Sequence, residues 1–124
     1  MTNGKSKQKI ESEVNEAMTK FLKEQLGEQA EQVITQVVED TIIVRFKGVL
    51  PPAEKHMIKN HEEKRLIKEV KGKLIEKVRP LLETLIQKLT NAQVIDIHSS
   101  FDVETDERIE IFILNKDLEK VCQV

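Results

Sequence analysis

The sequence predicts an α+β fold in two layers, with helices packed on one face of a four-stranded antiparallel sheet. An amphipathic helical pattern opens the chain, and two pairs of short β-rich runs follow it. A long charged segment with an apolar stripe, residues 53–89, separates the two pairs. The order α-β-β-α-β-β allows both helices to bury their apolar stripes on the same sheet face. It is also compatible with a circularly permuted ferredoxin-like arrangement.

The first helix is predicted from apolar residues that recur at intervals of three and four between Ile10 and Leu26. This spacing places them on one helical face. Gly27 follows directly, and glycine commonly ends a helix because it adopts positive φ without steric cost. We expect the helix to end there and the polar residues 1–8 to be frayed.

The first strand pair is predicted over residues 32–38 and 41–47, which are rich in Val, Ile and Thr. Glu39-Asp40 is short enough for a tight hairpin turn. The second of these strands alternates apolar residues on one face with a mixture that includes Ile43 and Arg45 on the other. We expect this mixed sheet face to be partly covered and to form the surface of a homodimer.

The long segment begins at Pro52, because proline is well accommodated in the first turn of a helix. A straight helix over 53–89 would be about 55 Å long, whereas a six-residue strand is about 20 Å long. The segment therefore breaks, or part of it overhangs the sheet and needs a partner. We expect a break at 60–63, where the apolar rhythm is interrupted, and a kink near Pro80.

The second strand pair is predicted over residues 92–99 and 108–114, joined by the polar, acidic connection 100–107. In the last strand, three isoleucines alternate on one face, and the opposite face begins with Arg108 and Glu110. The isoleucines are Ile109, Ile111 and Ile113.

The length of 124 residues fits a single domain over 1–124, with a frayed tail at 116–124. A single cysteine, Cys122, allows no internal disulfide, which suits a reducing cytoplasm. No apolar run approaches the roughly 18 to 20 residues that span a bilayer. We expect a soluble, cytoplasmic protein that does not insert into a membrane.

One trio has residue types that could serve a catalytic or metal site, namely Asp96, His98 and Asp102. Asp96 and His98 are two apart on a strand and so share a sheet face, where a solvated polar surface is the plainer interpretation. Ser99 follows His98 and points to the opposite face, so the two cannot pair as base and nucleophile. The four glycines are scattered and form no phosphate-binding loop. We expect no enzymatic activity, no cofactor and no metal.

Charge is unevenly distributed along the chain although the net charge is only −2. Residues 54–79 contain nine Lys or Arg against five Glu, while 92–124 contain eight acidic residues against three basic ones. Within the basic helix 64–79, three lysines share a helical face: Lys64, Lys68 and Lys71. This leaves open the alternative of a regulator that binds a small ligand or nucleic acid. The scarcity of aromatic side chains, four Phe without Trp or Tyr, argues against nucleic acid.

Several stretches of the chain together resemble the bacterial MpsC-type domain. They are Asp40-Thr-Ile-Ile-Val-Arg-Phe-Lys-Gly-Val-Leu-Pro-Pro-Ala-Glu54, Val78-Arg79-Pro80-Leu81-Leu82, Val94 to Ser99 and Glu107-Arg108-Ile-Glu-Ile-Phe-Ile-Leu114. The resemblance runs from about Ile10 to Leu114. It implies a soluble domain without catalytic residues, in an accessory or regulatory role for a sodium-translocating, membrane-potential-generating system.

The resemblance also identifies a candidate functional surface, because five charged residues lie in or next to the matching stretches. They are Arg79, Asp96, His98, Asp102 and Arg108. Salt bridging or turn formation is the plainer role for each of them. The leading hypothesis is a homodimeric interaction domain that serves a membrane transport or energy-coupling complex.

Overall fold

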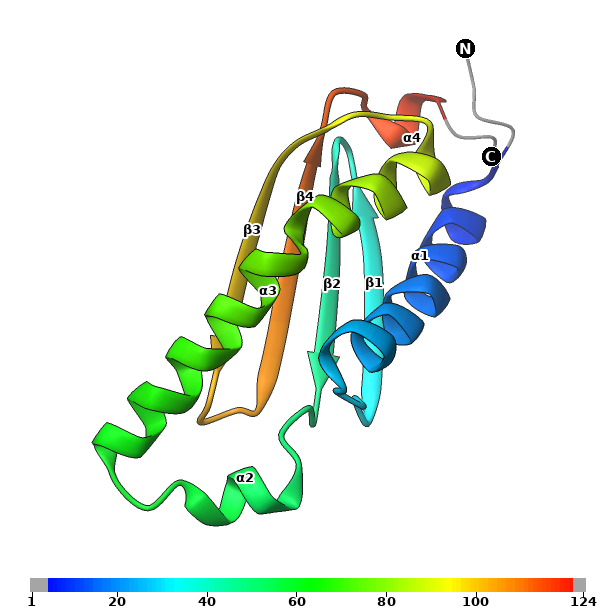
Figure 1. The fold of residues 1–124 in the computed structure, drawn as a ribbon. Helices are drawn as coiled ribbons and strands as arrows, with labels where there is room; N and C mark the ends of the chain where they lie inside the picture. The colour runs from blue at the N-terminus through cyan, green and yellow to red at the C-terminus, as the bar shows by residue number, and fades with distance from the viewer. Residues whose placement is uncertain (1–4, 122–124) are drawn as a thin grey trace.

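The computed structural model describes residues 5–121, which form two layers (Figure 1). The helices are α1 (Lys7–Phe21), its π-helical continuation η1 (Leu22–Leu26), α2 (Pro52–Met57), α3 (His61–Thr90) and α4 (Leu118–Val121). The strands are β1 (Gln32–Val38), β2 (Thr41–Lys47), β3 (Val94–Asp102) and β4 (Glu107–Leu114). The predicted α+β class and the predicted order of the main elements are confirmed.

The four strands form one sheet in the order β1-β2-β4-β3, and every neighbouring pair is antiparallel. This is the order obtained when the chain of a ferredoxin-like β-α-β-β-α-β domain begins at its first helix. The turn between β1 and β2 is the predicted Glu39-Asp40, with Glu39 at a φ of 56°. It places Val38 directly opposite Thr41 and so sets the register of the hairpin.

Both long helices cover the same face of the sheet, α1 over β1 and α3 over β3 (Figure 1). They approach each other where α1 begins and α3 ends, and there Lys5 Nζ donates to the carbonyl oxygen of Leu89 at 3.0 Å. Towards the other end of the sheet they diverge (Figure 1). The core between helices and sheet is built from buried apolar residues of every layer, including Ile10, Val14, Met18, Val37, Ile42, Val44, Phe46, Ile75, Leu82, Ile86 and Phe112.

The long helix breaks where the apolar rhythm predicts, between α2 and α3. The side chain of Asn60 starts α3 by accepting a hydrogen bond from the Glu63 N–H at 2.9 Å. From there α3 continues for 30 residues and passes through Pro80 without interruption. Its first turns extend beyond the edge of the sheet (Figure 1), and Leu66 and Val70 there are 47% and 53% exposed.

The second hairpin is longer than predicted, because β3 continues to Asp102 and β4 begins at Glu107. The predicted connection 100–107 therefore contains strand residues at both ends. Phe101 explains the difference: it is buried and pairs with Arg108, so the ladder continues past the expected end of the strand.

The tail expected to be frayed from 116 contains α4. Its first residue, Leu118, is fully buried and donates its N–H to the Glu39 carbonyl oxygen at 2.8 Å. An apolar side chain and a backbone hydrogen bond thus hold this segment against the β1–β2 turn. Cys122 lies outside the described residues.

Candidate functional site: a buried charge cluster beside an edge strand

A cluster of charged side chains fills the space where α1 and α3 diverge. It consists of Glu28, Glu54, Lys71, Arg108 and Glu110, contributed by the segment after η1, by α2, by α3 and by β4. All except the half-buried Glu54 are buried. Charges removed from water in this way need direct partners to offset the cost of desolvation.

Arg108 is the centre of the cluster. Its Nε donates to Glu28 Oε1 at 3.2 Å and its Nη2 to Glu28 Oε2 at 3.1 Å. Two parallel bonds of this kind match the planar guanidinium to a carboxylate. The guanidinium carbon also lies 5.6 Å from the centre of the Phe101 ring. The first loop of the chain is thereby bound to β4, 80 residues later.

Lys71 joins the cluster from α3. Its Nζ lies 3.1 Å from Glu28 Oε2 and 2.9 Å from Glu54 Oε1. The expectation that Lys71 forms an exposed basic face with Lys64 and Lys68 is therefore wrong. Lys71 lies four residues before the core residue Ile75, so it faces the sheet. Lys64 in turn is hydrogen-bonded to Glu104, which reduces the basic surface further.

Glu110 is fully buried and has two differently placed carboxyl oxygens. Oε1 accepts a hydrogen bond from the Ser99 hydroxyl. Oε2 has no hydrogen-bond partner among residues 5–121, and Arg108 Nη1 is 3.6 Å away. Burial raises the pKa of Glu110 to about 7, against the opposing effects of the Ser99 hydroxyl and Arg108. Glu110 is thus poised to change its charge near neutral pH.

The ion pairs of the cluster join the segment after η1, α2, α3 and β4. When Glu110 is protonated, the cations Lys71 and Arg108 balance the carboxylates Glu28 and Glu54. Within residues 5–121, no three His, Cys, Asp or Glu side chains are grouped so that they could hold a metal ion.

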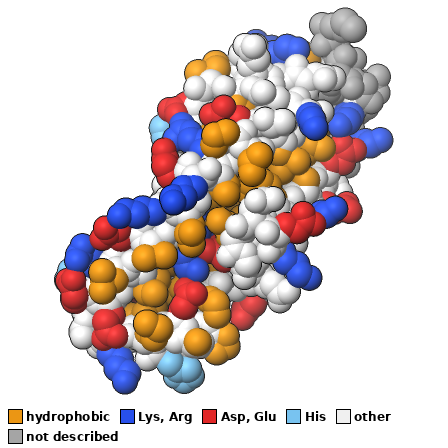
Figure 2. Space-filling model, in the orientation of Figure 1, with side chains coloured by type: hydrophobic (Ala, Val, Ile, Leu, Met, Phe, Trp, Pro, Cys, Tyr) orange, Lys and Arg blue, Asp and Glu red, His pale blue; other side chains and the backbone are white. Residues whose placement is uncertain are grey.

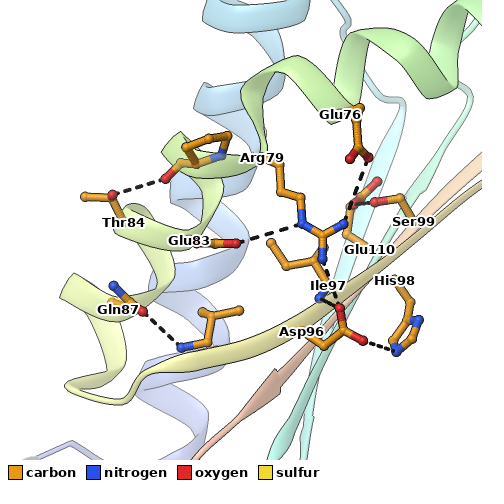
Figure 3. Close-up of polar contacts among 12 residues, drawn as sticks. Glu76, Arg79, Glu83, Thr84, Gln87, Asp96, Ile97, His98, Ser99 and Glu110 are labelled. Carbon is orange, nitrogen blue, oxygen red and sulfur yellow. Dashed lines mark hydrogen bonds and ion pairs between the residues drawn. The ribbon is translucent and has the colours of Figure 1, made fainter.

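Three of the five predicted surface residues meet at the edge of the sheet (Figure 3). Arg79 Nη2 of α3 lies 2.9 Å from Asp96 Oδ1 of β3, and Asp96 Oδ2 lies 3.2 Å from His98 Nε2. Asp96 Oδ1 also accepts the Ile97 N–H at 2.9 Å. The group fastens α3 to β3.

The other two predicted residues lie elsewhere. Asp102 Oδ1 accepts the Glu104 N–H at 2.8 Å and stabilises the β3–β4 turn, and Arg108 belongs to the buried cluster. The sequence-based prediction missed the other four cluster members, Glu28, Glu54, Lys71 and Glu110. A signal was present for Glu110, which alternates with Phe112 and Leu114 on the same face of β4.

The sheet face opposite the helices is not covered by any element of residues 5–121. Its centre is apolar, and its isoleucines are half-buried by their neighbours alone: Ile43, Ile109, Ile111 and Ile113. On the helix side of the molecule, apolar side chains gather between the helices and over the first half of α3 (Figure 2). The protein thus presents two apolar surfaces.

No helix within the described part of the chain is both long and apolar enough to cross a membrane. The family model of the Na⁺-translocating membrane potential-generating system (MpsC) matches residues 6–116. The chain is also similar to the uncharacterized protein YbcI of Bacillus subtilis (strain 168), with 37% identity over 116 residues that cover 94% of each chain. No solved structure matches the chain. Because the family model and this relative cover nearly the whole chain, the protein belongs to the MpsC family.

Proposed function

We propose that the protein is a non-catalytic, cytoplasmic interaction domain that forms a homodimer and serves as an accessory or regulatory subunit of a membrane-potential-generating system. The single observation that carries the dimer is the open, isoleucine-rich face of the sheet. The description of the family supports the link to the membrane system. The single cysteine suits the cytoplasm.

The size of the open sheet face is adequate for a dimer. Four strands about 4.8 Å apart and about eight residues long cover about 500 Å² in projection. Because side chains make the surface uneven, its accessible area is larger than this projected area. It approaches the roughly 800 Å² that each partner contributes to a standard interface. A dimer would remove the central isoleucines from water.

The arrangement of the isoleucines suits a two-fold axis. Ile111 lies midway between Ile109 and Ile113 on β4. A two-fold axis in the plane of the interface, across the strands at Ile111, brings Ile111 against its own copy and Ile109 against Ile113. Arg45 and Glu107, whose Nε and Oε1 are 2.7 Å apart, lie at one end of this row and would form a polar rim.

Replacing Ile111 by Glu tests the proposed interface. We expect wild type to sediment as a dimer at micromolar concentration and I111E to sediment as a folded monomer, because two facing carboxylates would be buried. The control is Leu66→Glu, an equivalent change on the exposed part of α3. A monomeric wild type contradicts the dimer, and dissociation by L66E rather than I111E moves the interface to α3.

The accessory role is tested by affinity capture of the tagged protein from its host, with detergent-solubilised membranes kept separate from the soluble fraction. We expect an integral membrane transporter to copurify from the membrane fraction, and the tagged transporter to recover this protein in return. Capture of the protein with itself alone, in both fractions, contradicts the accessory role without affecting the dimer.

A further inference from the structure

β3 is an edge strand, and part of its outer edge has free backbone groups. The Ile97 N–H is bonded to the Asp96 side chain at 2.9 Å rather than to β4. Hydrogen-bonding groups of an antiparallel strand alternate between its two sides, so those of Ser99 and Phe101 point outward as well. The register of the sheet leads to the same conclusion. Alternating hydrogen-bonded pairs from the Val38–Thr41 pair across β2 and β4 also leaves the backbone groups of Ser99 and Phe101 on the outer side of β3. No residue within 5–121 accepts the Ser99 or Phe101 N–H.

A groove runs beside this edge, between the first half of α3 and the end of β3. It consists of two adjoining cavities of about 290 and 480 Å³ that share Lys68, Ser100 and Phe101. Gly72 of α3 lines the smaller cavity, and a Cβ added to it would have no neighbour within 4 Å. The groove therefore has room for a main chain beside the strand and for a side chain beneath the helix.

The charge of the groove favours an acidic occupant. The larger cavity has Asp102 and Glu104 in its wall, but Glu104 is paired with Lys64, and Arg65 is paired with Glu62 and Glu69. Lys68, which lines both cavities, makes no ion pair with any residue from 5 to 121 and is the positive charge left for an occupant. The opposite sheet edge differs, because the Val37 N–H is bonded to Glu11 Oε2 at 2.8 Å. The cavity on that side, about 460 Å³, has Glu11 and Glu16 in its wall.

The length of the free edge is limited at one end. There the Arg79–Asp96 ion pair and a β-bulge at Ile95, which is 66% exposed, interrupt the edge. Irregularities of this kind prevent unrestricted pairing of edge strands. They leave the stretch from Ser99 to the β3–β4 turn available.

We propose that the groove between α3 and β3 binds an extended acidic segment of a partner protein by adding it as a strand to β3. Backbone hydrogen bonds to Ser99 and Phe101 hold the segment, as in other cases of strand addition. A carboxylate of the segment pairs with Lys68, and a small apolar side chain occupies the cavity next to Gly72 and Ile75. This binding mode does not depend on the proposed dimer, which uses a different surface.

The test begins with selection of a phage-displayed library of random octapeptides on the full-length protein. The affinity of an enriched peptide is then measured by fluorescence anisotropy for four variants. Gly72→Trp fills the groove, and Gly72→Ala is its control. Lys68→Glu reverses the charge of the groove, and Lys73→Glu, on an exposed position of the same helix, is the control for that change.

We expect enriched peptides to be acidic and to lose about tenfold or more in affinity for G72W and K68E, about 1.4 kcal/mol or more. G72A and K73E should bind within about twofold of wild type, since they leave the groove open and Lys68 in place. N-methylation of the peptide amides that pair with β3 should also abolish binding. A failure to enrich any peptide overturns the proposal, as does equal binding by G72W or by the N-methylated peptide. If the protein self-associates as its concentration rises and K68E abolishes this association, the groove binds a second copy of the chain. That result overturns the proposal of a partner segment.

Discussion

Glu110 has a buried carboxyl group, and its surroundings in the folded protein oppose its ionisation. It lies on β4 between two isoleucines of the open face, so its own side chain points towards the helices. There it loses nearly all contact with water. Its Oε2 receives no hydrogen bond within the described part of the chain, and Arg108 is too distant to donate one. The folded protein therefore favours the protonated form.

The raised pKa of Glu110 predicts that stability falls as pH increases. The pKa is about 7 in the folded protein against 4.5 for an ordinary Glu, so the folded state holds the proton more tightly than the unfolded chain. Below about pH 4.5, Glu110 is protonated in both the folded and the unfolded state. Between about pH 4.5 and 7, Glu110 ionises in the unfolded chain while it stays largely protonated in the folded protein, so the free energy of unfolding declines. Above about pH 7, Glu110 is ionised in both states and the decline levels off. The shift corresponds to about 3 kcal/mol. Urea unfolding at pH 5, 6, 7 and 8 measures the decline.

Glu110→Gln should remove this dependence, because an amide can accept the Ser99 hydrogen bond but carries no charge. E110Q is expected to be more stable than wild type at pH 8 and similar to it at pH 5. Glu104→Gln, a change in the exposed turn, is the control and should keep the wild-type dependence. An unchanged pH slope in E110Q would show that another group is responsible.

Spacing in the sequence predicted part of the site at the residue scale. Asp96 and His98 are two apart on one strand, so their proximity follows from local geometry. The contact between Glu28 and Arg108 spans 80 residues. No local pattern relates two residues so far apart, because their meeting depends on how the loop after η1 packs beneath α3.

At the scale of the elements, α3 is a helix that tolerates an internal proline. Pro80 lacks an N–H, so the Glu76 carbonyl has no hydrogen-bond donor at the usual position four residues later. The proline side chain is exposed and contributes no core packing. The helix is held instead by the buried side chains on its other face, Lys71, Ile75, Leu82, Ile86 and Thr90.

Pro80→Ala is therefore expected to stabilise the protein. Alanine is favoured over proline in a helix interior by about 3 kcal/mol, and a gain of about 1 to 3 kcal/mol is expected here. Thermal unfolding should show a rise of about 4 °C for each kcal/mol. Thr84→Ala, on another exposed position of α3, should change the melting temperature far less. A lower melting temperature for P80A would mean that the helix needs the proline to follow the sheet.

The boundaries of the elements were predictable where a cap or turn residue marks them. Asn60 starts α3 through its side chain, and Gly27 ends the first helical stretch at a φ of 66°. The end of β3 was missed because the acidic composition of 100–107 is typical of a loop. Pairing with β4 and the burial of Phe101 override that composition.

At the scale of the whole molecule, the C-terminal segment completes the fold although the family match ends at residue 116. Leu118 is fully buried in the core cluster, and its N–H bonds the Glu39 carbonyl. α4 thereby covers the end of the sheet near the β1–β2 turn.

Ending the chain after Lys116 should destabilise the protein by about 2 to 5 kcal/mol, the range expected for loss of a buried leucine. The measurement is urea unfolding of the truncated protein against a control that ends after Val121. The point variant Leu118→Ala should reproduce most of the loss. If the truncated protein matches wild type, α4 contributes nothing to the stability of the domain.

The sequence by itself determined the type and order of the main elements, the β1–β2 turn and the alternation of side chains along each strand. These follow from local periodicity, from the interruption of the apolar rhythm at 60–63 and from Gly27, which ends the first helix. The same alternation divides β4 into an isoleucine face and a face with Arg108 and Glu110, but it does not determine which face is buried.

Only the tertiary structure decided that the charged face of β4 lies in the interior. β2 sets Val44 opposite Glu110 and Phe46 opposite Arg108, and Val44 and Phe46 belong to the core. α3 connects β2 to β3 across β4, so every β4 side chain on that side is enclosed whatever its chemistry. The enclosed charges are stabilised by Glu28 and Lys71, which long-range packing brings within hydrogen-bonding distance. The same alternation places the isoleucines on the opposite face, which no element of residues 5–121 covers.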